Sequence, residues 1–122
     1  MTDGTMRIGE VAERTELSFR TLRHYDEIGL VTPSARTDGG FRLYTEDDVT
    51  RILLIRRMKP LGFSLEEMRE LLGVVDAIAA DADDQQVRAR LDAVRVEAAS
   101  RREKLSRQVQ MADEFLALLA EI

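Results

Sequence analysis

The stretch from Gln85 to Ile122 constrains the fold more than any other part of the sequence, because it contains neither glycine nor proline. Without such breakers it predicts one continuous helix, roughly 57 Å long at about 1.5 Å per residue. The whole chain has 122 residues, and the remaining ones are too few to bury a helix of that length. We therefore expect the helix to pack against a partner.

Apolar residues in this stretch recur with the seven-residue period of a coiled coil. One series is Leu91, Ala98, Leu105, Ala112 and Leu119, and the other is Val87, Val94, Phe115 and Ile122. Arg101 and Gln108 interrupt the second series, and polar residues at such positions weaken a coiled coil but can set its register. The simplest partner is the same helix of a second copy, with a dimer interface at Val87, Leu91, Val94, Ala98, Leu105, Ala112, Phe115 and Leu119. The alternative is a single solvated helix that folds back on its own domain.

Two short helices joined by a turn are predicted nearer the N-terminus. Apolar residues at Ile8, Val11 and Ala12 mark one face of the first helix. Ser18 can cap the second helix by accepting a hydrogen bond from its first amides, and Gly29 is typical of a helix end. This arrangement is a helix-turn-helix. The alternative is a generic pair of packed helices with a solvated polar face.

The outer face of the second helix is polar and mostly basic. On a helical wheel Phe19 and Leu22 point one way, with Tyr25 at the edge. The opposite face carries Arg20, Arg23, His24 and Glu27. A helix that reads DNA needs such exposed cations and hydrogen-bonding groups.

A short basic hairpin is predicted after this helix. Pro33 excludes helix, and the residues from Thr37 to Gly40 supply the turn. Phe41 and Leu43 then alternate with Arg42 and Tyr44, as a half-buried strand requires. Long cations beside the hairpin can reach a phosphate that the helix cannot. The alternative is a surface loop with ordinary solvated arginines.

Two further helices are predicted downstream, each with a capping box at its start. Thr45 and Asp48 form the first box, Ser64 and Glu67 form the second, and Pro60 separates the helices. The core face of the first helix is Val49, Ile52, Leu53 and Met58, and the expected buried stripe of the second is Leu65, Met68, Leu71, Leu72 and Val75. These helices most simply cover the helix-turn-helix and complete its core.

The charge balance and the missing cysteines exclude several classes of protein. The formal net charge is -5, which speaks against indiscriminate coating of nucleic acid. No cysteine is present, so disulfides and thiolate metal sites are excluded. No apolar run is long enough to span a membrane, and the polar residues from Thr2 to Thr5 are expected to form a frayed tail rather than a signal peptide. We expect a cytoplasmic protein.

Enzymatic chemistry is not expected. His24 is the only histidine, and Asp26, two positions on, points to another side of the helix. The segment from Asp81 to Asp84 has the composition of a solvated acidic turn and lacks the spacing of a metal-binding loop. We therefore expect no catalytic residue, no metal site and no cofactor.

From Met6 to about Leu72 the sequence resembles the N-terminal DNA-binding region of the MerR family of bacterial transcription regulators. The resemblance rests on three segments in the family's order and spacing, namely MRIGEVAERTELSFRTLRHYDEIGL, RTDGGFRLYTEDDV and LGFSLEEMRELL. It implies a mainly α-helical fold with a winged helix-turn-helix DNA-binding domain at residues 6–76. A long C-terminal antiparallel coiled-coil dimerisation helix would follow at residues 83–122, with no separate effector domain.

The resemblance also implies that a homodimer binds a pseudo-palindromic promoter. The recognition helix would contribute Ser18, Arg20, Thr21, Arg23, His24 and Tyr25. The wing would contribute Arg36, Phe41, Arg42 and Tyr44, and Lys59 would make an outer phosphate contact. Because phosphate contacts supply affinity and register, base choice is expected from Arg20 and His24.

Members of this family distort an overlong promoter spacer, which lets RNA polymerase engage both promoter elements. That mechanism reads DNA deformability, and the resemblance implies it here, with polymerase as an indirect partner through the promoter. His24 and Phe41 stand where tyrosine is frequent in relatives, and the cysteines of metal-sensing and redox-sensing members are absent. The alternatives are an effector-independent repressor or architectural DNA-binding protein, and a coiled-coil protein-interaction module.

Overall fold

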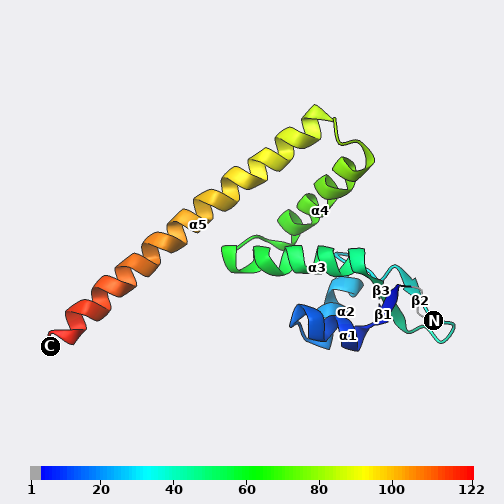
Figure 1. Ribbon diagram of the computed structural model, residues 1–122, viewed down its shortest axis with the longest axis horizontal. Helices are drawn as coiled ribbons and strands as arrows, with labels where there is room; N and C mark the ends of the chain where they lie inside the picture. Colours follow the sequence, from blue (N-terminus) through cyan, green and yellow to red (C-terminus); the bar gives the residue numbers. More distant parts are fainter. Residues whose placement is uncertain (1–3) are drawn as a thin grey trace. The chain divides into compact units, whose positions relative to one another are not determined.

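The computed structural model describes residues 4–122, so Thr2 and Asp3 of the expected tail lie outside the described residues. The fold is mainly α-helical, with a small antiparallel sheet and a long C-terminal helix, as predicted (Figure 1). The elements follow the order β1 (Thr5–Arg7), α1 (Ile8–Thr15), α2 (Phe19–Glu27), β2 (Ala35–Arg36), β3 (Arg42–Thr45), α3 (Glu46–Met58), the 3-10 turn η1 (Lys59–Leu61), α4 (Leu65–Ala80) and α5 (Gln85–Ala120). The chain forms two compact units, one up to Leu72 and one from Gly73 onward.

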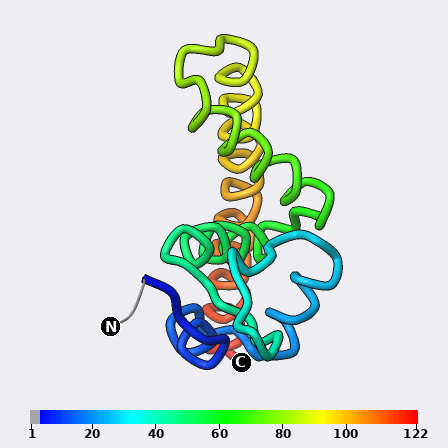
Figure 2. Tube along the Cα trace, turned by 90° about the vertical axis from the view of Figure 1, so that its right-hand side faces the viewer, coloured from blue at the N-terminus to red at the C-terminus, as the bar shows by residue number. Residues whose placement is uncertain are grey.

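The sheet of the first unit has the strand order β1-β3-β2, and both pairings are antiparallel. Figures 1 and 2 show β1 and β3 side by side, although Thr5 pairs with Thr45 far along the chain. Thr5 therefore begins a strand and is not part of a frayed tail. Met6 pairs with Tyr44, and both side chains are buried. This pairing fixes the root of the hairpin against the helices.

The predicted helix ends are confirmed by their hydrogen bonds. The Ser18 hydroxyl accepts from the Thr21 amide at 3.0 Å, and Thr45 and Asp48 form a complete capping box at the start of α3. The Glu67 amide donates to the Ser64 hydroxyl at 3.1 Å, and the Ser64 amide donates to the Glu67 carboxylate at 2.9 Å. The local sequence therefore determines where these helices begin.

Gly29 ends α2 with a Schellman motif. Its φ is +70°, a left-handed conformation that glycine adopts without strain. The Leu30 amide donates to the Tyr25 carbonyl at 2.9 Å, and the Gly29 amide donates to the Asp26 carbonyl at 3.0 Å. The last carbonyls of the helix are thereby satisfied, and the chain turns toward the hairpin.

The core of the first unit is built from α1, α2, α3, the sheet and the first turns of α4. Its most buried apolar side chains are Val11, Leu22, Tyr44, Val49, Ile52 and Ile55. Two expectations are wrong here: Phe19 is 46% exposed and Leu65 is 43% exposed. The inward stripe of α4 begins at Met68 and continues through Leu71 and Leu72. Leu65 is the first residue of its helix, so it lies at the rim of the core and not inside it.

The second unit contains the end of α4 and the whole of α5, which is one uninterrupted helix in Figure 1. Asp84 caps α5 by accepting from the amides of Gln86 and Val87. Val74 and Val87 are buried, whereas Val75 is exposed, contrary to the expected stripe. From Arg102 to Ile122 every residue is exposed. No described helix combines the length and the apolar character needed to cross a membrane.

Candidate nucleic-acid interface

The exposed face of α2 carries two arginines and a histidine that make no ion pair with any described residue. Arg20, Arg23 and His24 are all exposed, and among residues 4–122 none of them forms an ion pair. Ser18 and Thr21, at the start of the helix, are hydrogen-bonded to each other at 3.0 Å. The helix therefore presents free guanidinium and imidazole groups above a fixed N-terminal turn.

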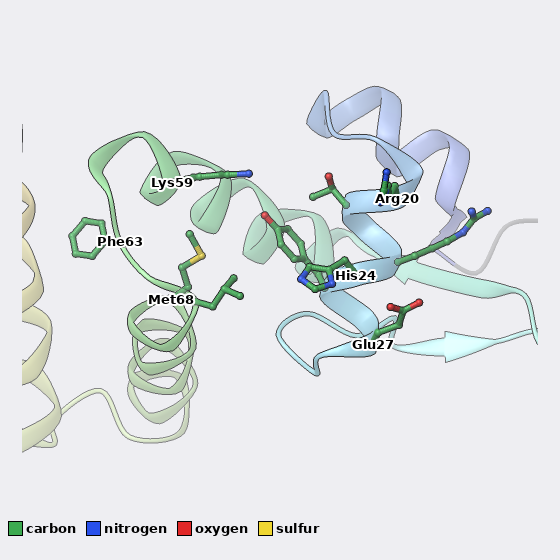
Figure 3. A pocket seen from close by; sticks show the side chains of 10 residues that line it. Arg20, His24, Glu27, Lys59, Phe63 and Met68 are labelled. Atoms are coloured by element: carbon green, nitrogen blue, oxygen red, sulfur yellow. The ribbon is translucent and has the colours of Figure 1, made fainter.

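A groove of about 920 Å³ runs along this face of α2. Its lining includes Arg20, Thr21, His24, Glu27, Lys59, Phe63, Leu65 and Met68. Figure 3 shows Lys59 extending from the opposite wall toward α2, with His24 on the α2 side. Cations thus stand on both walls, so the groove suits an anionic chain that lies between them.

Tyr25 and Tyr44, two of the predicted DNA-binding residues, are buried in the core. Tyr44 is 1% exposed and its hydroxyl has no hydrogen-bond partner among the described residues. Tyr25 is also buried, although it reaches the floor of the groove. Burial raises the pKa of both phenols above the ordinary value of 10.0. The helical wheel predicts Tyr25 only at the edge of the apolar face, so its burial could not be read from the sequence. The burial of Tyr44 depends on the pairing of β3 with β1.

Asp26 joins α2 to the hairpin, the predicted wing, formed by β2 and β3. Its Oδ2 atom accepts from Arg36 Nη2 and from Arg42 Nε, both at 2.7 Å, and its side chain is 9% exposed. Burial alone would raise the pKa of this carboxyl, but the hydrogen bonds from Arg42 and Arg36 hold the pKa below its ordinary value of 3.8. The two wing arginines are therefore oriented by α2 before any ligand binds.

Arg69 holds the other end of α2. Its guanidinium donates to the Ile28 carbonyl at 3.0 Å and to the Gly29 carbonyl at 3.3 Å. A cation at the C-terminal end of a helix also interacts favourably with the helix dipole. The first turns of α4 thereby fix the C-terminal end of α2.

Further contacts between elements come from ion pairs and from one buried carboxylate. Arg14 of α1 donates to both oxygens of Glu46 at 2.6 and 2.8 Å. Hydrogen bonding to Arg14 lowers the pKa of Glu46. Asp48 accepts from the amide and the hydroxyl of Ser34 at 3.0 and 2.8 Å, which ties the segment before the hairpin to the start of α3. Within residues 4–122, no three histidine or acidic side chains converge as metal ligands would.

A family model described as MerR HTH family regulatory protein matches residues 6–73, which is more than half of the 122 residues. The chain belongs to the MerR family. A second model, described as MerR, DNA binding, matches residues 49–117. Together the two MerR matches extend from β1 into the second half of α5.

Named MerR-type relatives align with the N-terminal part of the chain. This chain is 48% identical over 68 residues to the HTH-type transcriptional regulator ZntR of Escherichia coli. The alignment covers 56% of this chain and 48% of that regulator. The chain is 44% identical over 70 residues to the mercuric resistance operon regulatory protein of Bacillus cereus, covering 57% of this chain and 53% of that protein. The aligned part therefore spans about half the length of these relatives.

Solved MerR structures match most of the chain. The N-terminal part of the multidrug transporter activator of Bacillus subtilis is 34% identical, with 95% of each chain covered and a TM-score of 0.58. A MerR regulator lacking the sensor domain, solved on promoter DNA, has a TM-score of 0.75 over 96% of this chain and 91% of that one. It is 23% identical, so that likeness concerns the fold alone.

Most of the predicted MerR site residues lie either around the groove or at the wing. Arg20, Thr21, His24 and Lys59 lie together around the groove. Arg36 and Arg42 lie at the wing, bound to Asp26, and Phe41 is 63% exposed near the hairpin tip. Asp26, Arg69 and Arg7 also belong to this region, although the sequence did not predict their contacts. Only Asp26 gave a signal, as an acid inside a basic helix, but its partners are ten and sixteen residues away.

Proposed function

We propose that this MerR-family chain is a sequence-specific DNA-binding transcriptional regulator that acts as a homodimer on a pseudo-palindromic promoter. Residues 6–76 form the DNA-binding domain and residues 83–122 form the dimerisation helix. The regulator works in the cytoplasm and affects RNA polymerase indirectly, through the shape of the promoter.

One observation carries the DNA-binding part of this proposal. Arg20 and His24 lie on the exposed face of α2 without an ion pair among the described residues, across a groove from Lys59. An α-helix fits the major groove of DNA, where arginine can contact guanine through two hydrogen bonds. Lys59 has the charge and the reach to contact a phosphate beside the DNA major groove, and such contacts fix the register of the helix. Arg20 and His24 are therefore assigned to base choice, and Lys59 to the backbone.

The homodimer is supported by the apolar side chains of α5 that the single chain leaves uncovered. Leu105, Phe115 and Leu119 follow the predicted seam and are exposed. An antiparallel pair of such helices buries both copies of the seam around a two-fold axis. A two-fold dimer places two recognition helices on two half-sites, so the operator has matching symmetry.

DNA binding is tested with a duplex selected by the protein from a random-sequence pool. Fluorescence anisotropy at 50 and 200 mM salt should show a fall in affinity of about 10³-fold or more, because several phosphates are neutralised. Arg20→Gln and His24→Ala should change the selected bases, whereas Lys59→Gln should weaken all sequences alike. If no selected duplex binds even at low salt, the protein-interaction module becomes the better interpretation.

Promoter distortion and its outcome need separate measurements. Circularly permuted operator fragments should migrate differently in a gel once protein is bound, because a bent duplex migrates according to the position of the bend. Operator DNA that stays straight and normally twisted in the complex would refute this mechanism. Transcription from the same promoter with and without protein then distinguishes an activator from an effector-independent repressor.

A further inference from the structure

Two arginines at the edge of the reading surface are held by aromatic rings and not by carboxylates. The Arg7 guanidinium lies over the Phe41 ring, 5.4 Å from its centroid, and the Arg23 guanidinium lies over the Phe19 ring at 5.7 Å. Neither forms an ion pair among residues 4–122. A guanidinium stacked on a ring keeps its N–H groups at its edge, where they remain available to an anion.

Both rings lie at the surface of the molecule. Phe41 is 63% exposed and Phe19 is 46% exposed, so each ring is accessible to an arginine side chain. Phe41 is supported by the hairpin turn, because a Cβ placed on Gly39 would lie 3.5 Å from its ring. Phe19 is supported by α1, because a Cβ on Gly9 would lie 3.8 Å from its ring. Each ring is thus a supported platform for one arginine.

These arginines line a hollow of about 180 Å³ together with Ile8, Gly40, Phe41 and Arg42. Arg42 donates to Asp26 through Nε, and its terminal nitrogens donate to no acceptor in the described part of the chain. The lining includes three guanidinium groups and no acidic side chain. Because Arg7 and Arg23 have no carboxylate partner among the described residues and repel each other, an anion between them lowers the electrostatic free energy.

We propose that this hollow binds one backbone phosphate of the DNA duplex, with Arg7 as a phosphate contact and Phe41 as its positioning residue. The site rests on the proposed DNA-binding function and adds to it a contact from strand β1. The hollow has room for one phosphate group with water, since each water occupies roughly 30 Å³. Its lining joins β1, α2 and the hairpin, so one phosphate would be held by all three elements at once.

The test measures affinity for a selected duplex across a range of salt concentrations. Arg7→Gln should bind roughly tenfold more weakly, and the slope of log K against log salt should fall by about 0.9, the value of one lost phosphate contact. The selected sequence should stay the same. The matched control is Arg107→Gln, the same charge change at an exposed position of α5, which should leave affinity and slope unchanged.

Phe41 variants separate positioning from simple loss of structure. Phe41→Ala should weaken binding in the wild-type background and have little further effect in Arg7→Gln. Phe41→Tyr keeps the ring, so it should keep the affinity. Additive effects of Phe41→Ala and Arg7→Gln would contradict the positioning role.

Single methylphosphonate substitutions in the same duplex identify the phosphate itself. One neutralised position should weaken the wild-type protein but not Arg7→Gln. Arg7→Gln that binds like wild type, or no position that distinguishes the two proteins, overturns the proposed site while DNA binding stands. A wild-type protein that binds no duplex at low salt overturns the proposed function instead.

Discussion

The two compact units of this chain stabilise their helices by different means. In the unit up to Leu72, Ile55 and Val11 are fully buried, and the helix ends are capped by neighbouring side chains. In α5 the last turns expose Phe115, Leu116 and Leu119 to solvent. The first unit therefore buries its apolar side chains within itself, whereas α5 carries apolar side chains that its own unit does not bury. In the proposed function, DNA binding uses a basic surface of the first unit and dimerisation uses an apolar surface of α5.

The largest expected effect belongs to the pairing surface. Phe115→Glu should weaken the proposed dimer by about 3–6 kcal/mol, because each of the two copies loses about 1.5–3 kcal/mol of buried phenyl. Analytical ultracentrifugation over a dilution series measures the change. Gln110→Glu adds the same charge outside the seam and should leave the dimer intact. A wild-type chain that sediments as a monomer at all concentrations would remove the contrast between the units.

Truncating a core side chain of the first unit should destabilise the protein by the same amount at every protein concentration. Ile55→Ala should lower the free energy of unfolding by about 2–5 kcal/mol, since the side chain is fully buried. Urea denaturation at several protein concentrations gives the value. Leu54→Ala removes similar atoms from a half-buried neighbour and should cost less. A concentration-dependent loss in Ile55→Ala would mean that the first unit also depends on the partner.

Removing the charge of Asp26, which holds the two wing arginines, should lower the free energy of unfolding. Asp26→Asn should cost about 1–3 kcal/mol at neutral pH, because both charged hydrogen bonds weaken. The folded-state pKa of Asp26 is lowered, so its stabilisation is fully present above the ordinary pKa of 3.8 and is lost as pH falls through the lower folded value. Urea titrations between about pH 2 and 7 cover the range in which carboxyl groups titrate. The free energies of unfolding of the wild type and Asp26→Asn should converge at the acidic end.

The control for this prediction is an aspartate in the turn of the hairpin that Asp26 contacts. Asp38→Asn makes the same charge change at an exposed position without an ion pair among the described residues, and it should leave stability nearly unchanged. An Asp26→Asn protein as stable as wild type at pH 7 would show that the wing does not depend on α2.

A smaller effect is expected where α4 holds the end of the reading helix. Arg69→Gln should cost about 0.5–1 kcal/mol, since the side chain is exposed and two carbonyl contacts are lost. Hydrogen exchange should quicken in the last turn of α2 and little elsewhere. Glu70→Gln alters the neighbouring charge and serves as the control. Unchanged exchange in that turn would mean that the Schellman motif alone holds the helix end.

The smallest expected effect is that of Tyr44→Phe, which tests whether Tyr44 is only a core residue or also contacts DNA. Tyr44→Phe removes a buried hydroxyl that has no partner in the described chain, so stability should be unchanged or higher by up to about 1 kcal/mol. DNA affinity should also be unchanged in the anisotropy assay. A clear loss of affinity would restore the assignment of Tyr44 to the wing surface that the sequence suggests.

The sequence predicts local features of this protein well. Ser18, Thr45 and Ser64 cap their helices because each hydroxyl reaches an amide three residues away, and such short-range chemistry can be read without a fold. The glycine-free stretch likewise predicts α5, which runs from Gln85 to Ala120. The family resemblance from Met6 onward is also confirmed.

Long-range pairing is what the sequence does not reveal. Strand β1 has three residues, too few for a period-two pattern to stand out. Because β1 pairs with β3, Tyr44 turns inward and Phe41 stays outside, which no count along β3 alone decides. The partners of Asp26 and Arg7 also depend on this pairing, so the wing surface could be predicted by residue type but not by contact.

The pairing of Thr5 with Thr45 has a consequence for synthesis of the protein. The ribosome adds about 5–20 residues per second, so β1 waits roughly 2–8 s before its partner strand exists. During that interval Met6, which ends up buried, has no strand beside it, and α1 and α2 form inside an open loop. The beginning of the newly made chain is therefore the part that a protease or chaperone can reach until the hairpin has been translated.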